Sequence, residues 1–136
     1  MKFKFIEDLT SDVMFEAYGK NLKELFENSA EALFTIICEI EKIEPKKEKI
    51  IEVSGEDIKD LLFNWLQSLI AVVDVDEMFL SKFKIEEINE TKVRAKCYGE
   101  DISKEKSGTV VKGVTYYNFD IEKNENGYVA KVVLDI

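Results

Sequence analysis

The sequence contains no histidine, one arginine and one proline among its 136 residues. Without an imidazole, neither a Ser-His nor a Cys-His dyad can activate a nucleophile. Glycine is scarce as well, and the phosphate-binding patterns GxGxxG and GxxxxGKS/T do not occur. These absences argue against nucleophilic catalysis and against the common nucleotide-binding loops.

Cysteine is also rare, with only Cys38 and Cys97. Because no CxxC pattern and no histidine accompany them, we expect two reduced core cysteines rather than a disulfide or a thiolate metal site. The longest apolar stretch, residues 66–75, is interrupted by polar side chains and is too short to span a bilayer. No signal-peptide pattern opens the chain. We therefore expect a cytoplasmic protein that makes no membrane contact.

Basic residues are too few to cover a nucleic-acid-binding face. The chain has 28 acidic and 19 basic residues and a formal net charge of −9. Its densest basic cluster, Lys46, Lys47 and Lys49, is diluted by Glu44 and Glu48. Since nucleic-acid binding depends on basic groups that displace counterions from phosphate, we expect no direct nucleic-acid contact. An acidic protein suits metal cations or a basic protein partner.

Two segments have the spacing of amphipathic helices. Asn21 is a favourable N-cap, and Glu24 three residues later resembles a capping box. Apolar side chains then recur at helical spacing over the next twenty residues. Asp57 is the expected N-cap of a second, more apolar helix. Trp65 lies on its apolar face and is expected in the core.

The other segments alternate apolar and polar residues, which is typical of strands. The expected strands are residues 2–7, 13–18, 49–53, 78–88, 92–98, 110–122 and 128–136, and Asn126-Gly127 indicates a tight hairpin between the last two. The predicted order is β-β-α-β-α-β-β-β-β. We expect an α+β fold, with two helices packed on antiparallel β-sheet, in a single domain of residues 1–136.

Acidic groups at both ends of the sequence form the candidate functional site. Asp135 and Ile136 end the last predicted strand, and Asp8 and Asp12 lie in the polar break between the first two strands. Carboxylate oxygens without histidine or thiolate suit Ca²⁺, Mg²⁺ or Mn²⁺ rather than Zn²⁺. The sequence therefore suggests a small site for a hard cation. The alternative is that Asp12 is a turn residue and Asp135 a solvated strand residue.

Three further residues are secondary candidates near this site. Glu100 is a second-rank acidic candidate, as is Asp8. Lys112 interrupts an apolar strand, where it is either a snorkelling edge residue or a cation beside the carboxylates, and Thr115 follows it on the same strand. A phosphohydrolase that uses Asp12, Asp135 and Lys112 around a divalent ion is the enzymatic alternative.

Six blocks of residues occur in a recognisable order along nearly the whole chain. They are Asp8-x-Thr10-Ser11-Asp12-Val13, Ala17-Tyr18-Gly19-x-x-Leu22-x-Glu24-Leu25-Phe26, Gly55-x-Asp57-x-x-x-Leu61-Leu62-x-x-Trp65-Leu66, Gly99-Glu100, Val111-Lys112-x-Val114-Thr115-Tyr116 and Leu134-Asp135-Ile136. Together these blocks resemble the archease family.

The resemblance implies an archease-like fold and a protein with no reaction of its own. It implies an activator of the tRNA-splicing RNA ligase, which joins 3′-phosphate or 2′,3′-cyclic phosphate ends to 5′-hydroxyls. Archeases promote guanylylation of the active-site histidine of that ligase and its multiple turnover. Some members have instead been viewed as chaperones or modulators of RNA methyltransferases, which remains an alternative partner.

The resemblance also implies a divalent-metal site, usually described as calcium. This site maps onto Asp12, Asp135 and the terminal Ile136. Two positions depart from the family pattern, because Leu9 and Tyr117 stand where the family commonly has histidine. The two carboxylates are retained, so the expected metal site does not depend on those imidazoles.

Overall fold

The computed structural model describes residues 1–6 and 12–136. Two α-helices, two short 3-10 helices (η) and seven strands follow one another along the chain. They are β1 (Phe3–Ile6), β2 (Val13–Gly19), α1 (Leu22–Ile37), η1 (Ile40–Lys42), β3 (Lys47–Ser54), α2 (Ile58–Asp76), β4 (Met78–Ile88), β5 (Lys92–Asp101), η2 (Lys104–Lys106), β6 (Gly113–Asn124) and β7 (Gly127–Asp135). The predicted α+β class and element order are confirmed.

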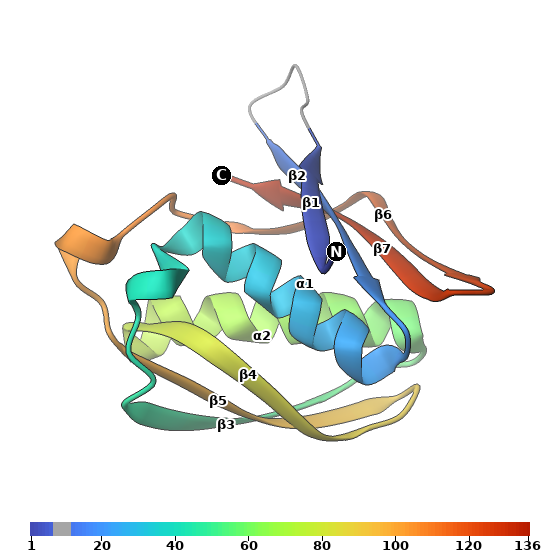
Figure 1. Ribbon diagram of the computed structural model, residues 1–136, viewed down its shortest axis with the longest axis horizontal. Helices are drawn as coiled ribbons and strands as arrows, with labels where there is room; N and C mark the ends of the chain where they lie inside the picture. Colours follow the sequence, from blue (N-terminus) through green and yellow to red (C-terminus); the bar gives the residue numbers. More distant parts are fainter. Residues whose placement is uncertain (7–11) are drawn as a thin grey trace.

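The strands form two antiparallel sheets with the helices between them (Figure 1). One sheet has four strands in the order β1-β2-β7-β6, and the other has three in the order β3-β5-β4. Sequence alternation predicted antiparallel sheet without indicating this division. Helix α1 contacts β2 of one sheet and β4 of the other, and α2 contacts β6 and β3. Both helices therefore bury apolar side chains toward two sheets, which explains why their apolar faces are wide.

Both helices begin with the predicted caps. The Asn21 side chain accepts a hydrogen bond from the backbone N–H of Glu24 at 2.9 Å, and the Glu24 carboxylate accepts one from Lys20 N at 3.1 Å. Asp57 accepts from Asp60 N at 2.8 Å in the same way at the start of α2. These bonds satisfy amides that a helix leaves without partners in its first turn. The helix starts are thus determined locally, by side chains three residues apart.

The core lies between the two sheets. Trp65 is fully buried at its centre, and its indole N–H donates to the carbonyl of Phe26 at 3.1 Å, which joins α2 to α1. Cys38 and Cys97 are free thiols and are buried, as expected. No helix among the described residues has the length and apolar character needed to cross a bilayer.

The sixth strand differs from its prediction at its start. It begins at Gly113 rather than at residue 110, so Lys112 lies outside it. The preceding residues instead close the end of α1, where Gly108 N donates to Ile37 O and Thr109 N donates to Ile36 O, both at 2.8 Å. Residues 110 and 111 have the apolar character of a strand, but burial of Val111 against the helix ends overrides that pattern.

The predicted hairpin between the last two strands is confirmed, shifted by one residue. Asn124 pairs with Gly127, so the loop consists of Glu125 and Asn126. Gly127 has a φ of +128°, a conformation that favours glycine because it lacks a Cβ.

Candidate functional site at the β2–β7 end

The register of β2 and β7 brings Asp12 and Asp135 together. Val13, the first residue of β2, pairs with Leu134 of β7; Asp12 directly precedes Val13, and Asp135 directly follows Leu134. The sequence separates these two residues by most of its length, whereas neighbouring strands place directly opposed Cα atoms roughly 4.5–5.5 Å apart. The start of β2 and the end of β7 therefore lie side by side at one end of the four-stranded sheet (Figure 1).

Both carboxylates lie on the face of the sheet that points away from the helices. Phe15 and Leu134 are fully buried on the helix-facing side of β2 and β7. Because successive side chains on a strand alternate between faces, Val13 shares their side, and Asp12 and Asp135 point to the other. Asp135 is exposed and Asp12 is half-buried. This placement leaves the Asp135 carboxylate open to solvent on a rigid strand.

Strand β6 and the residue before it bind the other edge of β7 at Asp135. Lys112 N donates to the carbonyl of Asp135 at 2.7 Å, and Gly113 pairs with Asp135 in the register. Thr115 pairs with Val133, two residues along, and shares the face of Asp135. The structure thus gathers four predicted site residues, Asp12, Lys112, Thr115 and Asp135, around the end of β7, with Ile136 directly after it.

The start of β6 is anchored by residues that the sequence did not single out. Gln67 of α2 accepts a hydrogen bond from Val114 N at 2.9 Å through its side-chain oxygen. On α2, Phe63 stacks on Tyr116 with ring centroids 4.1 Å apart and an angle of 6° between the rings. Nothing local in the sequence marks Gln67 for this role. Phe63 lies off the apolar face of its helix, which signals a contact other than the common core.

Next to the site, β6 departs from regular pairing. The register shifts between Thr115 and Asp120, and Asn118 takes a positive φ of 54°. Tyr116 and Tyr117 in this bulge are 73% and 71% exposed. A bulge on an edge strand interrupts the ladder, which removes a template for pairing with another chain. It also leaves two large aromatic side chains exposed, of which Tyr116 points toward α2 rather than to the face of Asp135.

The other secondary candidates lie elsewhere. Glu100 is on β5 of the three-stranded sheet, where its carboxylate accepts from Glu44 N and contacts Lys106 Nζ at 3.1 Å. The backbone N–H of Glu44, and then Lys106, hold the pKa of Glu100 below its usual value. Its carboxylate is therefore ionised and engaged with groups other than Asp135. Asp8 and Leu9 lie outside the described residues.

The oxygen atoms available at this end of the sheet are of the type that binds hard cations, but they are few. Asp12 and Asp135 supply carboxylates and Ile136 can supply a main-chain oxygen, which are the ligand types that Ca²⁺ and Mg²⁺ prefer. Within residues 1–6 and 12–136, no group of three or more acidic, histidine or cysteine side chains is gathered closely enough to hold a metal. Further ligands from water or from a partner are needed to complete a coordination shell.

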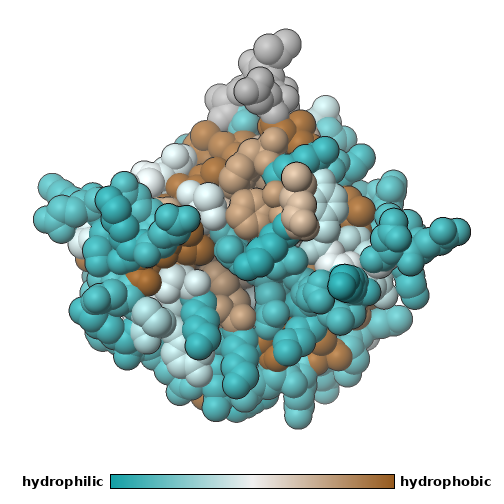
Figure 2. All heavy atoms as spheres, viewed as in Figure 1, coloured by the Kyte–Doolittle hydropathy of each residue, from teal (hydrophilic) through white to brown (hydrophobic). Residues whose placement is uncertain are grey.

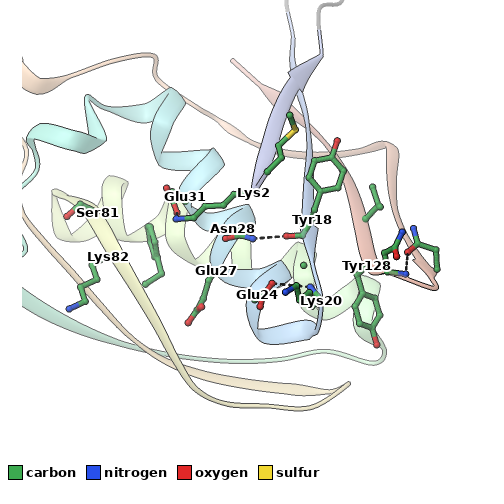
Figure 3. A pocket seen from close by; sticks show the side chains of 16 residues that line it. Lys2, Tyr18, Lys20, Glu24, Glu27, Asn28, Glu31, Ser81, Lys82 and Tyr128 are labelled. Atoms are coloured by element: carbon green, nitrogen blue, oxygen red, sulfur yellow. Dashed lines mark hydrogen bonds and ion pairs between the residues drawn. The ribbon is translucent and has the colours of Figure 1, made fainter.

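A separate hollow of about 880 Å³ lies toward the opposite end of β2, between α1 and β4 (Figure 3). It is lined by side chains of both signs whose polar groups are engaged with one another. Lys2 pairs with Glu31 at 3.1 Å, and Asn28 donates to the Tyr18 carbonyl at 2.7 Å. Glu27 accepts from the backbone N–H of Ile85 at 2.9 Å. These contacts fasten α1 to both sheets, and none of the predicted site residues lines the hollow.

The cysteines offer no nucleophile. Burial raises the pKa of Cys38 to about 12, and burial followed by the charge of Glu27 raises that of Cys97 to about 12. Both thiols are therefore protonated at neutral pH, and only a thiolate attacks efficiently.

Comparison with known proteins identifies relatives along the whole chain. Residues 3–136 match the model of the archease protein family. Protein archease of Sulfurisphaera tokodaii is 40% identical over 139 residues, with 99% of each chain covered. The solution structure of Methanobacterium thermoautotrophicum protein 1598 is similar, with a TM-score of 0.82, 32% identity and 99% coverage of both chains.

A second solved structure has the same fold at lower identity. It is an archease of Thermotoga maritima, described as a possible chaperone, with a TM-score of 0.68 and 24% identity. The comparison covers 96% of this chain and 95% of that one. At this identity the likeness bears on the fold alone.

Proposed function

The chain belongs to the archease family, and from this premise we propose that it is a non-catalytic activator of the tRNA-splicing RNA ligase. The observation that carries the proposal is the pairing of Val13 with Leu134, which sets Asp12, directly before β2, and Asp135, the last residue of β7, at the same end of the four-stranded sheet. In this proposal the chain promotes guanylylation of the ligase and its multiple turnover, and performs no reaction itself.

The residues of this end of the sheet would position a divalent cation, calcium in the first instance and magnesium or manganese as alternatives. Asp12 and Asp135 would bind it through their carboxylates, and Ile136 through a main-chain oxygen. A bound cation would supply positive charge that a phosphate group can approach. Lys112 N restrains the Asp135 carbonyl at 2.7 Å, which limits the movement of the strand end when a partner docks. Because the protein offers few ligands, the affinity of the free protein for the cation should be modest.

The surface around the site supports docking to a protein. Figure 2 shows apolar side chains gathered at the upper end of the molecule, over β1, and largely hydrophilic side chains below them. Phe5 of β1 is 41% exposed, and Tyr116 and Tyr117 add exposed aromatic area from β6; Phe5, opposite Phe15, and Tyr116, stacked on Phe63, face the other side of the sheet from Asp135. Aromatic side chains are enriched at protein interfaces. The net charge of −9 favours a basic partner, as an RNA-binding ligase is expected to be.

The proposal is tested with purified ligase, GTP and an RNA with a 3′-phosphate end. Substoichiometric wild-type protein should raise ligase turnover, and Asp12→Asn or Asp135→Asn should remove most of that stimulation. Calorimetric titration should show that wild-type protein binds Ca²⁺ and that both variants have lost this binding. Asp101→Asn is the matched control, since Asp101 likewise ends a strand, where it pairs with Lys47 at 2.7 Å. Full stimulation by both site variants would refute the role of the carboxylates.

A chaperone function is the second candidate. The exposed Tyr116, Tyr117 and Val110 provide surface for a client such as an RNA methyltransferase, the partner that the family resemblance offers as an alternative. This function predicts that the protein suppresses aggregation of the client and that Asp135→Asn leaves the suppression unchanged. Assaying the protein alone with Mn²⁺ and RNA tests the hydrolase alternative, which requires turnover without ligase.

A further inference from the structure

A second surface lies where the two helices end. Figure 1 shows that the C-terminal ends of α1 and α2 lie at the same end of the molecule, beside residues 102–112. A groove of about 510 Å³ opens between these three segments. We call it the helix-end groove, and its apolar lining includes Ile37, Ile70, Val73, Phe79, Ile102 and Val110.

The apolar lining is open to solvent at its rim. Val110 is 77% exposed and Ile102 is 40% exposed, although both follow segments that are tied down by backbone hydrogen bonds. Ile102 N donates to Glu77 O at 2.9 Å, and Gly108 N donates to Ile37 O at 2.8 Å. The groove is therefore held open by the ends of both helices. Its exposed valine and isoleucine would lose contact with water if an apolar side chain entered.

The charge at the rim has one sign. Asp74 and Glu77 line the groove at the end of α2, where the last turn of the helix has no basic residue. The neighbouring Asp76 is paired with Lys49 at 3.1 Å, whereas Asp74 and Glu77 form no ion pair among the described residues. A helix C-terminus carries partial negative charge and is stabilised by cations rather than by carboxylates. This end of α2 thus carries negative charge that the chain itself does not balance.

The backbone conformation of Glu77 also lowers the stability of the folded chain at this helix end. Its φ is 54°, in the left-handed region, at the position after the helix where glycine or asparagine is favoured. A glycine there would relieve the strain and remove a carboxylate from a negative helix end. Both changes favour folding, so nothing in the packing or charge of the helix end accounts for a glutamate at this position.

We propose that the helix-end groove binds a segment of a partner protein that carries an aliphatic side chain next to lysine or arginine. The aliphatic side chain would fill the apolar centre, and the basic group would pair with Asp74 and Glu77. A second copy of this chain is a poor occupant because each copy has a net charge of −9 and the same acidic rim. The proposal concerns a surface separate from Asp12 and Asp135, and it holds whether or not those residues bind metal.

The test uses the intact protein and a labelled amphipathic peptide with leucine on one face and lysine on the other. Fluorescence anisotropy at low ionic strength measures its affinity, and two control peptides replace either every lysine with glutamate or every leucine with serine. Backbone amide NMR spectra should change at residues 70–77 and 102–111 on titration with the first peptide only. Failure of that peptide to bind, or equal binding of the controls, would overturn the proposal.

Variants of the protein locate the site. Val110→Ser should weaken binding about five-fold through lost apolar contact, and Glu77→Gly about three-fold through lost charge. Glu77→Gly should also hold or raise the melting temperature, so weaker binding would not reflect unfolding. Val75→Ser is the matched control, because Val75 is 78% exposed at the end of α2 without lining the groove. Equal effects of Val75→Ser and Val110→Ser would contradict the proposal, as would self-association that Val110→Ser abolishes.

Discussion

Two glycines in strands should respond in opposite ways to the same substitution. Gly99 lies on the central strand β5, between Lys47 of β3 and Leu80 of β4. A Cβ at Gly99 would lie 1.8 Å from the carbonyl oxygen of Phe79 and 2.8 Å from the Cα of Leu80. Real Cβ atoms essentially never come within 3.0 Å of such atoms, so β4 would have to move away. The β4–β5 pairing depends on the missing side chain.

The loss of stability caused by Gly99→Ala follows from the movement of β4 that the new Cβ requires. A displacement of more than 1 Å would break two or three ladder hydrogen bonds, each with a net contribution of about 1 kcal/mol. Repacking of the buried strand adds to this, so we expect a loss of roughly 2–4 kcal/mol in the free energy of unfolding. For a domain of this size that corresponds to a fall in melting temperature of roughly 6–14 °C.

Gly113→Ala is the control for the steric argument. A Cβ at Gly113 would meet only the Gln67 side chain, at 3.4 Å, which is ordinary van der Waals contact. Among the described residues, Gly113 is not one of the glycines with a positive φ. Alanine at Gly113 should therefore be neutral or stabilising by up to about 1 kcal/mol, through reduced freedom of the unfolded chain. Urea unfolding followed by circular dichroism measures both variants. Equal midpoints for Gly99→Ala and Gly113→Ala would refute the close approach of β4 and β5.

Two other predictions concern the core. Trp65→Phe should destabilise the protein by roughly 2 kcal/mol, because it removes the hydrogen bond to Phe26 O and leaves a cavity; an unchanged urea midpoint would contradict the proposed link between the helices. The buried thiols of Cys38 and Cys97 have pKa values of about 12, raised from 9.0. The unfolded chain thus releases these protons at lower pH than the folded chain, so their contribution to stability is complete below about pH 9 and is lost as the pH rises toward 12. The double variant with alanine at both positions should lose less stability than wild type between about pH 8 and pH 11, and parallel urea midpoints would contradict this linkage.

The helices were predictable because their signals are local. Asn21 with Glu24, and Asp57 with the apolar face that follows, define each helix start within a few residues, and both caps form. The order of the strands followed from alternation in the same way. The division into two sheets was not predictable, because it depends on which strands pair across long stretches of chain, and the helices that separate the sheets supply no pairing signal.

The start of β6 shows where local pattern fails. The apolar Val110 and Val111 predicted a strand. Val111 is instead buried against the helix ends, and pairing between β6 and β7 begins only at Gly113. The bulge around Asn118 was likewise hidden, because an irregular register leaves the alternation of apolar residues nearly intact. For the site, the resemblance assigned Asp12 and Asp135 to one metal site; the pairing of Val13 with Leu134 puts both at the same end of the sheet, and metal binding stays a prediction. Glu100, which the resemblance did not assign to the metal site, lies in the other sheet with other partners.

The placement of the two carboxylates follows from the core beneath them. Like charges directly opposite each other on neighbouring strands are unfavourable by roughly 0.2–1 kcal/mol. A slip of one residue between β2 and β7 would separate them, but it would also turn Phe15 or Leu134, both fully buried, toward solvent. Burial of each such side chain contributes roughly 1.5–3 kcal/mol, so the core determines the register and the acids stay opposed.

Because the core fixes the register of β2 and β7, a cation that binds both Asp12 and Asp135 requires no refolding of either strand. A cation that binds Asp12 and Asp135 should therefore relieve their repulsion and stabilise the folded chain by RT ln(1 + [L]/Kd). The melting temperature should rise with added Ca²⁺ in the wild type and stay constant in Asp12→Asn and Asp135→Asn. Absence of any rise in the wild type at millimolar Ca²⁺ would mean that the free protein does not bind the ion, and that a partner must contribute ligands before the carboxylates can act.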